Sequence, residues 1–228
     1  MKKIVSVMML AGIAAAGGCK KKEIITAPDK PFAITGHFVA GTNTQKTGSK
    51  YTSVYFIRFL EGNKALFIAS AATDLEGTYA LTDSSLLFEV TGSNARTAKF
   101  TLNKNKQITS AYYSGSGPVE YEATAELLPI TGTNELAGKI FKGDEFKMGA
   151  SSNRAGLIYS FNKAGASTYG SGTDAGAIDN TATSYTLIGG SGFKSVNGST
   201  TELGFVSDKR LTVFRSSGLF YYGTYDQQ

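Results

Sequence analysis

The side chains that could perform covalent chemistry are few in this chain. His37 is the only histidine and Cys19 the only cysteine, so a mechanism with two imidazoles is excluded and a zinc site built on histidine and cysteine is nearly so. Serine is frequent, but no Gly-x-Ser-x-Gly motif joins a strand pattern to a helix pattern. We therefore expect no enzyme activity, no catalytic residue and no cofactor, and we interpret His37 as a solvent-facing strand residue.

Two groups of carboxylates could in principle carry chemistry. Glu120, Glu122 and Glu126 project from one face of a strand pattern, and paired carboxylates can cleave glycosidic bonds. They lie on the polar side of a clean alternation, however, which favours a solvated surface. Asp174 and Asp179 lie in a glycine-rich loop that could hold calcium, but their spacing does not match an EF-hand. We favour an ordinary loop and predict no metal site.

Aromatic residues are the most suggestive feature for binding. The chain has 12 tyrosines and 14 phenylalanines but no tryptophan, and tyrosine can stack on a ligand ring while its hydroxyl hydrogen-bonds. In the adjacent pairs Tyr112-Tyr113 and Tyr221-Tyr222, a strand would turn one ring outward. We predict these four tyrosines as ligand-binding residues, with the outward rings as the best candidates. The alternative is that they fill a core without tryptophan.

The chain begins with segments in the order that is typical of an export signal. Lys2 and Lys3 precede an apolar stretch, residues 4–16, that ends in two glycines. A membrane-spanning helix needs about 20 apolar residues. Because this stretch is shorter, residues 1–18 are predicted to be a cleaved signal peptide.

The residues Ala16, Gly17, Gly18 and Cys19 resemble the lipobox of bacterial lipoproteins, with alanine where leucine is commoner. The resemblance implies that Cys19 becomes the N-terminus and that its thiol takes a diacylglycerol. A cysteine with two or three acyl chains anchors durably, whereas one chain anchors only marginally. We therefore expect a lipid-anchored protein of the cell envelope, held on the periplasmic or surface face of the outer membrane.

The net positive charge is confined to this N-terminal region. The formal net charge is +5, which Lys2, Lys3 and the run Lys20–Lys22 account for, so the chain from Glu23 onward is neutral. A nucleic-acid surface needs a basic face on the folded body, and we therefore expect no nucleic-acid partner. Residues 19–31 are interpreted as a lipidated tether.

Beyond the tether, the chain consists of short strand patterns separated by Gly, Asn, Asp and Ser. Apolar and polar residues alternate from Val119 to Leu127, which predicts a half-buried strand, and residues 98–103 alternate likewise. Tight polar connections of the kind that link antiparallel neighbours occur at Glu61–Lys64, Asn103–Lys106 and Ser207–Arg210. The expected fold is all-β, an antiparallel up-and-down meander.

The second half of the chain repeats the first. Five segments recur in the same order at offsets of 102 to 106 residues: Gly36–Phe38 with Gly138–Phe141, Tyr55–Gly62 with Leu157–Gly165, Thr78–Leu81 with Ser184–Leu187, Leu87–Val90 with Gly192–Val196, and Ala98–Phe100 with Leu203–Phe205. An internal duplication explains this order. It predicts a first β unit over residues 32–130 and a second over residues 131–228. Whether they form two barrels or one stays open.

Each unit has an opening Gly-x-(aromatic or apolar) strand, a Phe-x-x-x-Gly hairpin and a Tyr-x-Leu strand. This pattern, over residues 34–127 and 136–225, resembles the lipocalin-like domains of secreted bacterial lipoproteins, although the Gly-x-Trp of true lipocalins is absent. The resemblance implies up-and-down β-barrels with a possible interior cavity. We expect a small apolar or glycan ligand there. The alternative is an interaction module that presents β edges and aromatic patches to an envelope protein.

Overall fold

The structure, a computed structural model, describes residues 32–148, 151–163 and 166–228. The expected signal peptide and Cys19 lie outside these residues. The compact unit Ala33–Gln228 holds the fold that follows. Within the described ranges, no helix combines the length and the apolar content that a membrane crossing would require.

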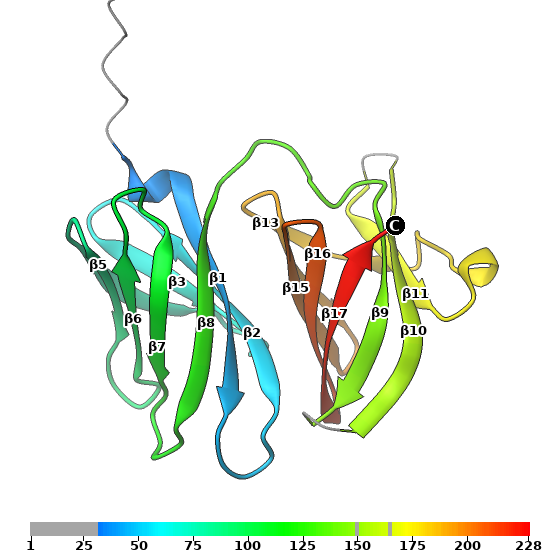
Figure 1. The fold of residues 1–228 in the computed structure, drawn as a ribbon, viewed down its shortest axis with the longest axis horizontal. Coiled ribbons are helices and arrows are strands. Elements are labelled where there is room, and N and C mark those ends of the chain that lie inside the picture. The colour runs from blue at the N-terminus through cyan, green and yellow to red at the C-terminus, as the bar shows by residue number, and fades with distance from the viewer. Residues whose placement is uncertain (1–31, 149–150, 164–165) are drawn as a thin grey trace, which may run out of the picture. The chain divides into compact units, whose positions relative to one another are not determined.

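The first half of the chain folds into one antiparallel sheet of eight strands that curls into a barrel (Figure 1). Its strand order is β7-β6-β5-β4-β3-β2-β1-β8, so each strand pairs with its chain neighbour and β8 returns to β1. The strands are β1 (His37–Gln45), β2 (Thr52–Phe59), β3 (Lys64–Ile68), β4 (Leu75–Leu81), β5 (Ser85–Val90), β6 (Arg96–Leu102), β7 (Ile108–Ser114) and β8 (Tyr121–Pro129). The short 3-10 helix η1 (Ile34–Gly36) precedes them.

The second half forms a second antiparallel sheet, in the order β12-β11-β10-β9-β17-β16-β15-β14-β13. Its strands are β9 (Ile140–Lys147), β10 (Ser151–Phe161), β11 (Thr168–Gly172), β12 (Thr183–Ser184), β13 (Thr186–Ile188), β14 (Gly192–Asn197), β15 (Thr200–Ser207), β16 (Arg210–Ser217) and β17 (Leu219–Gln227). A 3-10 turn, η2 (Ala175–Ala177), lies between β11 and β12. The two sheets answer the question that the sequence left open, because they form two nearly closed barrels.

The two barrels match strand by strand, which supports the predicted duplication. β1 pairs with both β2 and β8, and β9 pairs in the same way with both β10 and β17. The counterpart of β4 is the interrupted strand β12 and β13: its first part pairs with β11 and its second with β14, on either side of Tyr185. All five repeated segments fall on equivalent strands.

The two sheets end at different strands of the repeat. In the second barrel, β16 and β17 pair over eight residue pairs, from Arg210↔Asp226 to Ser217↔Leu219. In the first, the equivalent strands β7 and β8 are the two ends of the sheet, and the bridge Ser114↔Glu120 joins them at the hairpin end. The first sheet therefore ends at β7 and β8, whereas the second sheet ends at β12 and β13.

The three predicted tight connections are hairpin turns, and their backbone φ angles explain which residue types occur in them. Asn63 (φ 60°) and Lys106 (φ 59°) adopt left-handed conformations in the β2–β3 and β6–β7 turns. Asp208 (φ 47°) and Lys209 (φ 64°) both do so between β15 and β16. Two successive positive φ angles give the hairpin turn whose twist matches that of the flanking strands.

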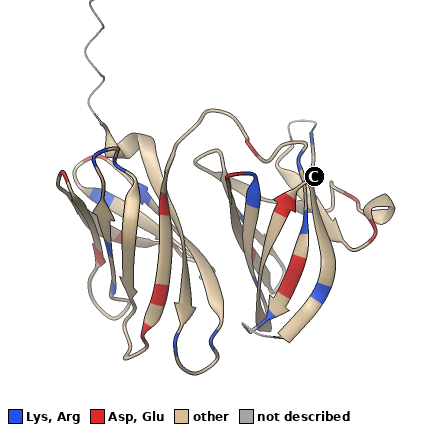
Figure 2. Ribbon diagram, in the orientation of Figure 1, with Lys and Arg blue, Asp and Glu red and all other residues tan. Residues whose placement is uncertain are grey.

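Alternation decides which side chains enter each barrel. In β8 the odd positions from Tyr121 to Leu127 are partly buried, whereas Glu122, Thr124 and Glu126 are exposed, as predicted; Figure 2 shows acidic positions along this strand. In β2, Tyr55 points inward while Phe56 belongs to an outer apolar cluster. The two-sided apolar pattern of β2 thus reflects burial on both faces.

The outer apolar cluster joins strands of both halves. Phe38 and Phe56 of the first half pack with Phe205 and Phe214 of the second, and the Phe56 and Phe205 rings meet edge to face at 6.3 Å. Phe205 therefore faces out of its barrel, whereas Phe100, its partner in the sequence repeat, lies on the alternately buried face of β6. The repeat is shifted in phase by one residue at this strand.

Two equivalent glycines provide a test of the duplication. A Cβ on Gly41 of β1 would lie 2.6 Å from the Thr124 carbonyl oxygen, and one on Gly143 of β9 would lie 2.2 Å from the Thr224 carbonyl oxygen. We expect Gly41→Ala and Gly143→Ala each to lower the free energy of unfolding by about 1–3 kcal/mol through overpacking. Gly132→Ala, where a Cβ meets nothing within 4 Å, is the control in urea denaturation. Equal stability of all three variants would contradict the equivalence.

Candidate functional site

A small pocket opens in the first barrel, and we call it the first-barrel pocket. Its volume is about 180 Å³, and its wall includes Asn43, Tyr51, Tyr55, Arg96, Tyr113 and Tyr121. This volume is below the roughly 300 Å³ at which pockets for drug-sized ligands begin, so the pocket suits a ligand of about one ring.

Stacked rings form one wall of this pocket. The Tyr55 ring stacks on Tyr113 at 5.4 Å and on Phe67 at 5.6 Å between centroids, and Tyr121 meets Tyr113 edge to face at 5.1 Å. Rings at these separations hold one another in fixed orientations. β2, β3, β7 and β8 therefore supply a rigid aromatic surface.

The Tyr55 hydroxyl is the unusual polar group of the pocket. The side chain is fully buried, and the hydroxyl oxygen has no hydrogen-bond partner in the described part of the chain. Burial raises the pKa of this phenol well above its ordinary value, with a smaller contribution from Tyr113, so it stays a neutral donor. Buried polar groups are almost always paired, so this hydroxyl is an exception among the described residues, as is the Tyr159 hydroxyl of the second barrel.

Arg96 supplies a positive charge beside these rings. Its Nη1 donates to the Ala95 carbonyl at 2.8 Å and to the Ser116 hydroxyl at 3.2 Å. None of the ion pairs formed among the described residues includes Arg96. On the same wall the Ser53 hydroxyl donates to the Asn43 amide oxygen. The pocket therefore combines aromatic faces, neutral hydrogen-bonding groups and one cation.

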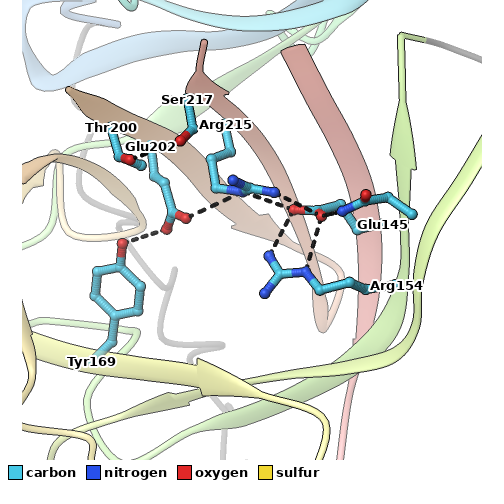
Figure 3. A network of polar contacts seen from close by, with 8 residues as sticks. Glu145, Arg154, Tyr169, Thr200, Glu202, Arg215 and Ser217 are labelled. Atoms are coloured by element: carbon cyan, nitrogen blue, oxygen red, sulfur yellow. Dashed lines mark hydrogen bonds and ion pairs between the residues drawn. The ribbon is translucent and has the colours of Figure 1, made fainter. Parts of the chain in front are cut away.

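The second barrel holds a group of charged and polar side chains, shown in Figure 3, that we call the charge network: Glu145, Arg154, Arg215, Glu202 and Tyr169. The Glu145 carboxylate is 1% exposed and accepts two hydrogen bonds from each arginine. The four donor–acceptor distances are 2.9–3.0 Å, the range of strong charge-assisted bonds.

Local structure explains how two arginines reach one carboxylate. Arg154 lies between two register shifts in β10, where the pairing with β9 is irregular, and a bulge of this kind re-aims a side chain. Arg215 comes from β16, directly opposite Glu202 of β15. The Tyr221 ring covers the Arg215 guanidinium at 3.9 Å, which keeps that cation in place.

The two glutamates of the network have opposite pKa shifts. For Glu145, burial disfavours ionisation, but the hydrogen bonds from Arg215 and Arg154 outweigh it and lower the pKa to about 2. For Glu202, burial dominates and raises the pKa, although Tyr169 donates a hydrogen bond to its carboxylate. Arg215 lies farther from Glu202, at 3.8 Å. Glu145 is therefore the firmly ionised member.

The four tyrosines predicted from the sequence lie in different surroundings. Tyr113 lines the first-barrel pocket, and Tyr221 covers Arg215 in the second barrel. Tyr112 is 54% exposed, with the Lys99 ammonium 5.9 Å from its ring centre. Tyr222 is half-buried opposite Phe214 and Phe146. The structure thus brings only the inward ring of the first pair into the pocket.

Sequence reasoning missed the main polar residues of both sites. On the inward face of β1, Asn43 follows Val39 and Gly41, and on that of β9, Glu145 follows Phe141 and Gly143. A polar residue at an inward position that continues a run of apolar residues and glycine was the available signal. Arg96 stands at the start of a strand, where charged residues are common and carry no such signal.

The other candidate residues do not assemble into a site. Glu120 pairs with Lys46 at 3.7 Å, and His37 Nδ1 lies 2.9 Å from the Ala33 carbonyl oxygen. Asp174 accepts a hydrogen bond from the Gly176 amide, and Asp179 from Thr181. Across the described ranges no cluster of three or more potential metal-ligating side chains occurs.

No family model, no curated protein and no solved structure matches this chain. The function is therefore inferred from the geometry of the two barrels.

The charge network predicts a defined pH dependence of stability. Because the pKa of Glu145 falls from 4.5 to about 2 on folding, its contribution is fully present above about pH 4.5 and is lost as the pH falls towards 2. We expect Glu145→Gln to lower the free energy of unfolding at pH 7 by about 3 kcal/mol, since it leaves two partly buried cations without their carboxylate partner.

Urea denaturation followed by circular dichroism at several pH values checks this prediction. The difference between the wild type and Glu145→Gln should shrink between pH 4.5 and pH 2. A difference that stays constant over this range would show that Glu145 is not held ionised by the arginines.

Proposed function

We propose that this chain is a noncatalytic, lipid-anchored protein of the bacterial envelope that binds a small ligand in the first-barrel pocket. The observation that carries the proposal is the fully buried Tyr55 hydroxyl without a partner, on the wall of an aromatic pocket. A ligand that accepts a hydrogen bond from the Tyr55 hydroxyl would supply the partner that no described residue supplies.

The energetics of this hydroxyl favour a binding role. A buried polar group left unpaired costs about 1–3 kcal/mol, and in a rigid barrel this cost is present before the ligand arrives. Binding then recovers it, together with the burial of a ligand ring against Tyr113 and Tyr121. A glycan ring has the hydroxyl groups and the apolar face for both contacts, and a small apolar ring has the face alone.

The interior of the second barrel serves a structural role in this proposal. Its polar side chains are already paired, because Glu145 binds both arginines, and Glu202 accepts a hydrogen bond from Tyr169 and lies 3.8 Å from Arg215. The remaining hollow, of about 140 Å³, is lined by Tyr169, Ser195 and Glu202 among others. A ligand that entered this hollow would compete with the hydrogen bond that Tyr169 already donates to Glu202.

The proposal of a lipid anchor is based on the order of the N-terminal residues. A charged start, a short apolar stretch and two glycines lead directly to Cys19, and acylation of that thiol would confine the barrels to a membrane surface. Attachment at the outer membrane, on either face, is the location that we propose.

An interaction module is the alternative function. In the described chain, β7 and β8 share one bridge pair, Ser114↔Glu120, so a strand from an envelope protein could add to either edge. The aromatic patch formed by Phe56, Phe205 and Phe214 is buried within the chain, which argues against its use as a docking surface.

A pair of hydroxyl deletions tests the observation on which the binding role is based, that the Tyr55 hydroxyl has no partner. Tyr55→Phe removes an unpaired hydroxyl, so we expect the stability of the free protein to stay unchanged or to rise. Tyr169→Phe removes a hydroxyl that donates to the buried Glu202 and should cost about 1–3 kcal/mol. Thermal unfolding followed by circular dichroism compares the two. A large loss of stability in Tyr55→Phe would show that its hydroxyl already has a partner.

The anchor has its own test. We expect Cys19→Ala to abolish acylation and to release the chain from the membrane fraction of cells. Sedimentation measures the release, and mass spectrometry of the N-terminal peptide measures the acyl groups. If the variant sediments with membranes as firmly as the wild type, the proposal that Cys19 carries the lipid anchor is wrong.

A further inference from the structure

Equivalent positions in the two barrels differ in charge. Glu145 lies two residues after Gly143 in β9, and Asn43 lies two residues after Gly41 in β1. Each pairs with the strand that closes its barrel, Asn43 with Ala123 of β8 and Glu145 with Gly223 of β17. The second barrel therefore has a carboxylate where the first has a neutral amide.

This difference leaves the cation of the first barrel without an internal acid. In the second barrel Glu145 is within 2.9 Å of both Arg154 and Arg215. In the first, Arg96 shares the pocket wall with Asn43 and Tyr55, and the described ion pairs do not include it. Glu120, which precedes the pocket residue Tyr121, is paired with Lys46 instead.

We infer that the ligand of the first-barrel pocket is a single-ring molecule bearing a carboxylate, and that Arg96 binds this carboxylate as the arginines of the second barrel bind Glu145. The inference rests on the proposed binding function and adds the chemical class of the ligand. An acidic sugar and an aromatic acid share this chemistry.

The arrangement around Arg96 suits such a ligand. A guanidinium can give a carboxylate two parallel hydrogen bonds, and these are stronger beside apolar rings than in bulk water because the local dielectric constant is lower. With the carboxylate at Arg96, the ligand ring lies against the tyrosines of the wall, and the Tyr55 hydroxyl donates to a polar substituent or to the carboxylate itself. The Arg96 Nη1 keeps its hydrogen bonds to Ala95 and Ser116, and the ligand adds a carboxylate to the partners of this guanidinium.

Two matched ligand pairs test the inference. The full-length protein, purified from membranes and held in lipid nanodiscs, is titrated calorimetrically with glucuronate and glucose, and with benzoate and benzamide. We expect at least one acid to bind about tenfold or more tightly than its neutral analogue, which corresponds to about 1.4 kcal/mol. The acid that binds identifies the source as a sugar or an aromatic compound.

Two arginine variants show where the carboxylate binds. Arg96→Gln should remove the preference for the acid and leave the affinity for the neutral analogue unchanged. Arg58→Gln, which removes an exposed cation of β2, is the matched control and should keep the preference. Unchanged acid binding in Arg96→Gln would overturn the assignment of Arg96.

The remaining outcomes separate this inference from the proposed function. Equal affinities for acid and neutral analogue, lowered alike by Tyr55→Phe, would overturn the carboxylate requirement and leave the binding function standing. Absence of binding for all four compounds at millimolar concentration would overturn both.

Discussion

In each half of the molecule the first strand pairs with the last, and this contact turns a meander into a barrel. β1 and β8 pair over nine residue pairs, from His37↔Pro129 to Gln45↔Tyr121, and β9 and β17 over seven. Once these strands meet, alternation places one face of every strand inside. The inward residues of eight strands must then share a small volume, so their sizes and charges are strongly interdependent.

The two barrels solve this problem differently. The first fills most of its interior with stacked rings and keeps a small pocket beside Arg96 and Tyr55. The second encloses two arginines and two glutamates, an arrangement that is tolerable only because each charge has a close partner. The same sequence pattern thus gives two different interiors. In the first, Arg96 forms no ion pair with a described residue, and in the second the arginines and glutamates pair with one another.

Much of the architecture could be predicted from the sequence, because alternation and turn residues are local signals. The alternation of β8, the three tight turns and the order of the repeated segments all appear in the structure. The interruption at Tyr185 could not be predicted, since it arises when one strand divides its pairing between β11 and β14. Arg96 could not be predicted as a pocket residue for a similar reason. It shares the pocket wall with residues of distant strands, and these strands meet only in the barrel.

The outer phenylalanines have a consequence for how the molecule denatures. Phe38 lies against Gly189, where a Cβ would approach its ring to 2.2 Å, and Phe56 lies against Phe205. Melting either barrel would expose rings that belong to the other. The two halves are therefore coupled into one cooperative unit, so the calorimetric enthalpy of the transition should equal its van't Hoff enthalpy, although the chain carries two cores.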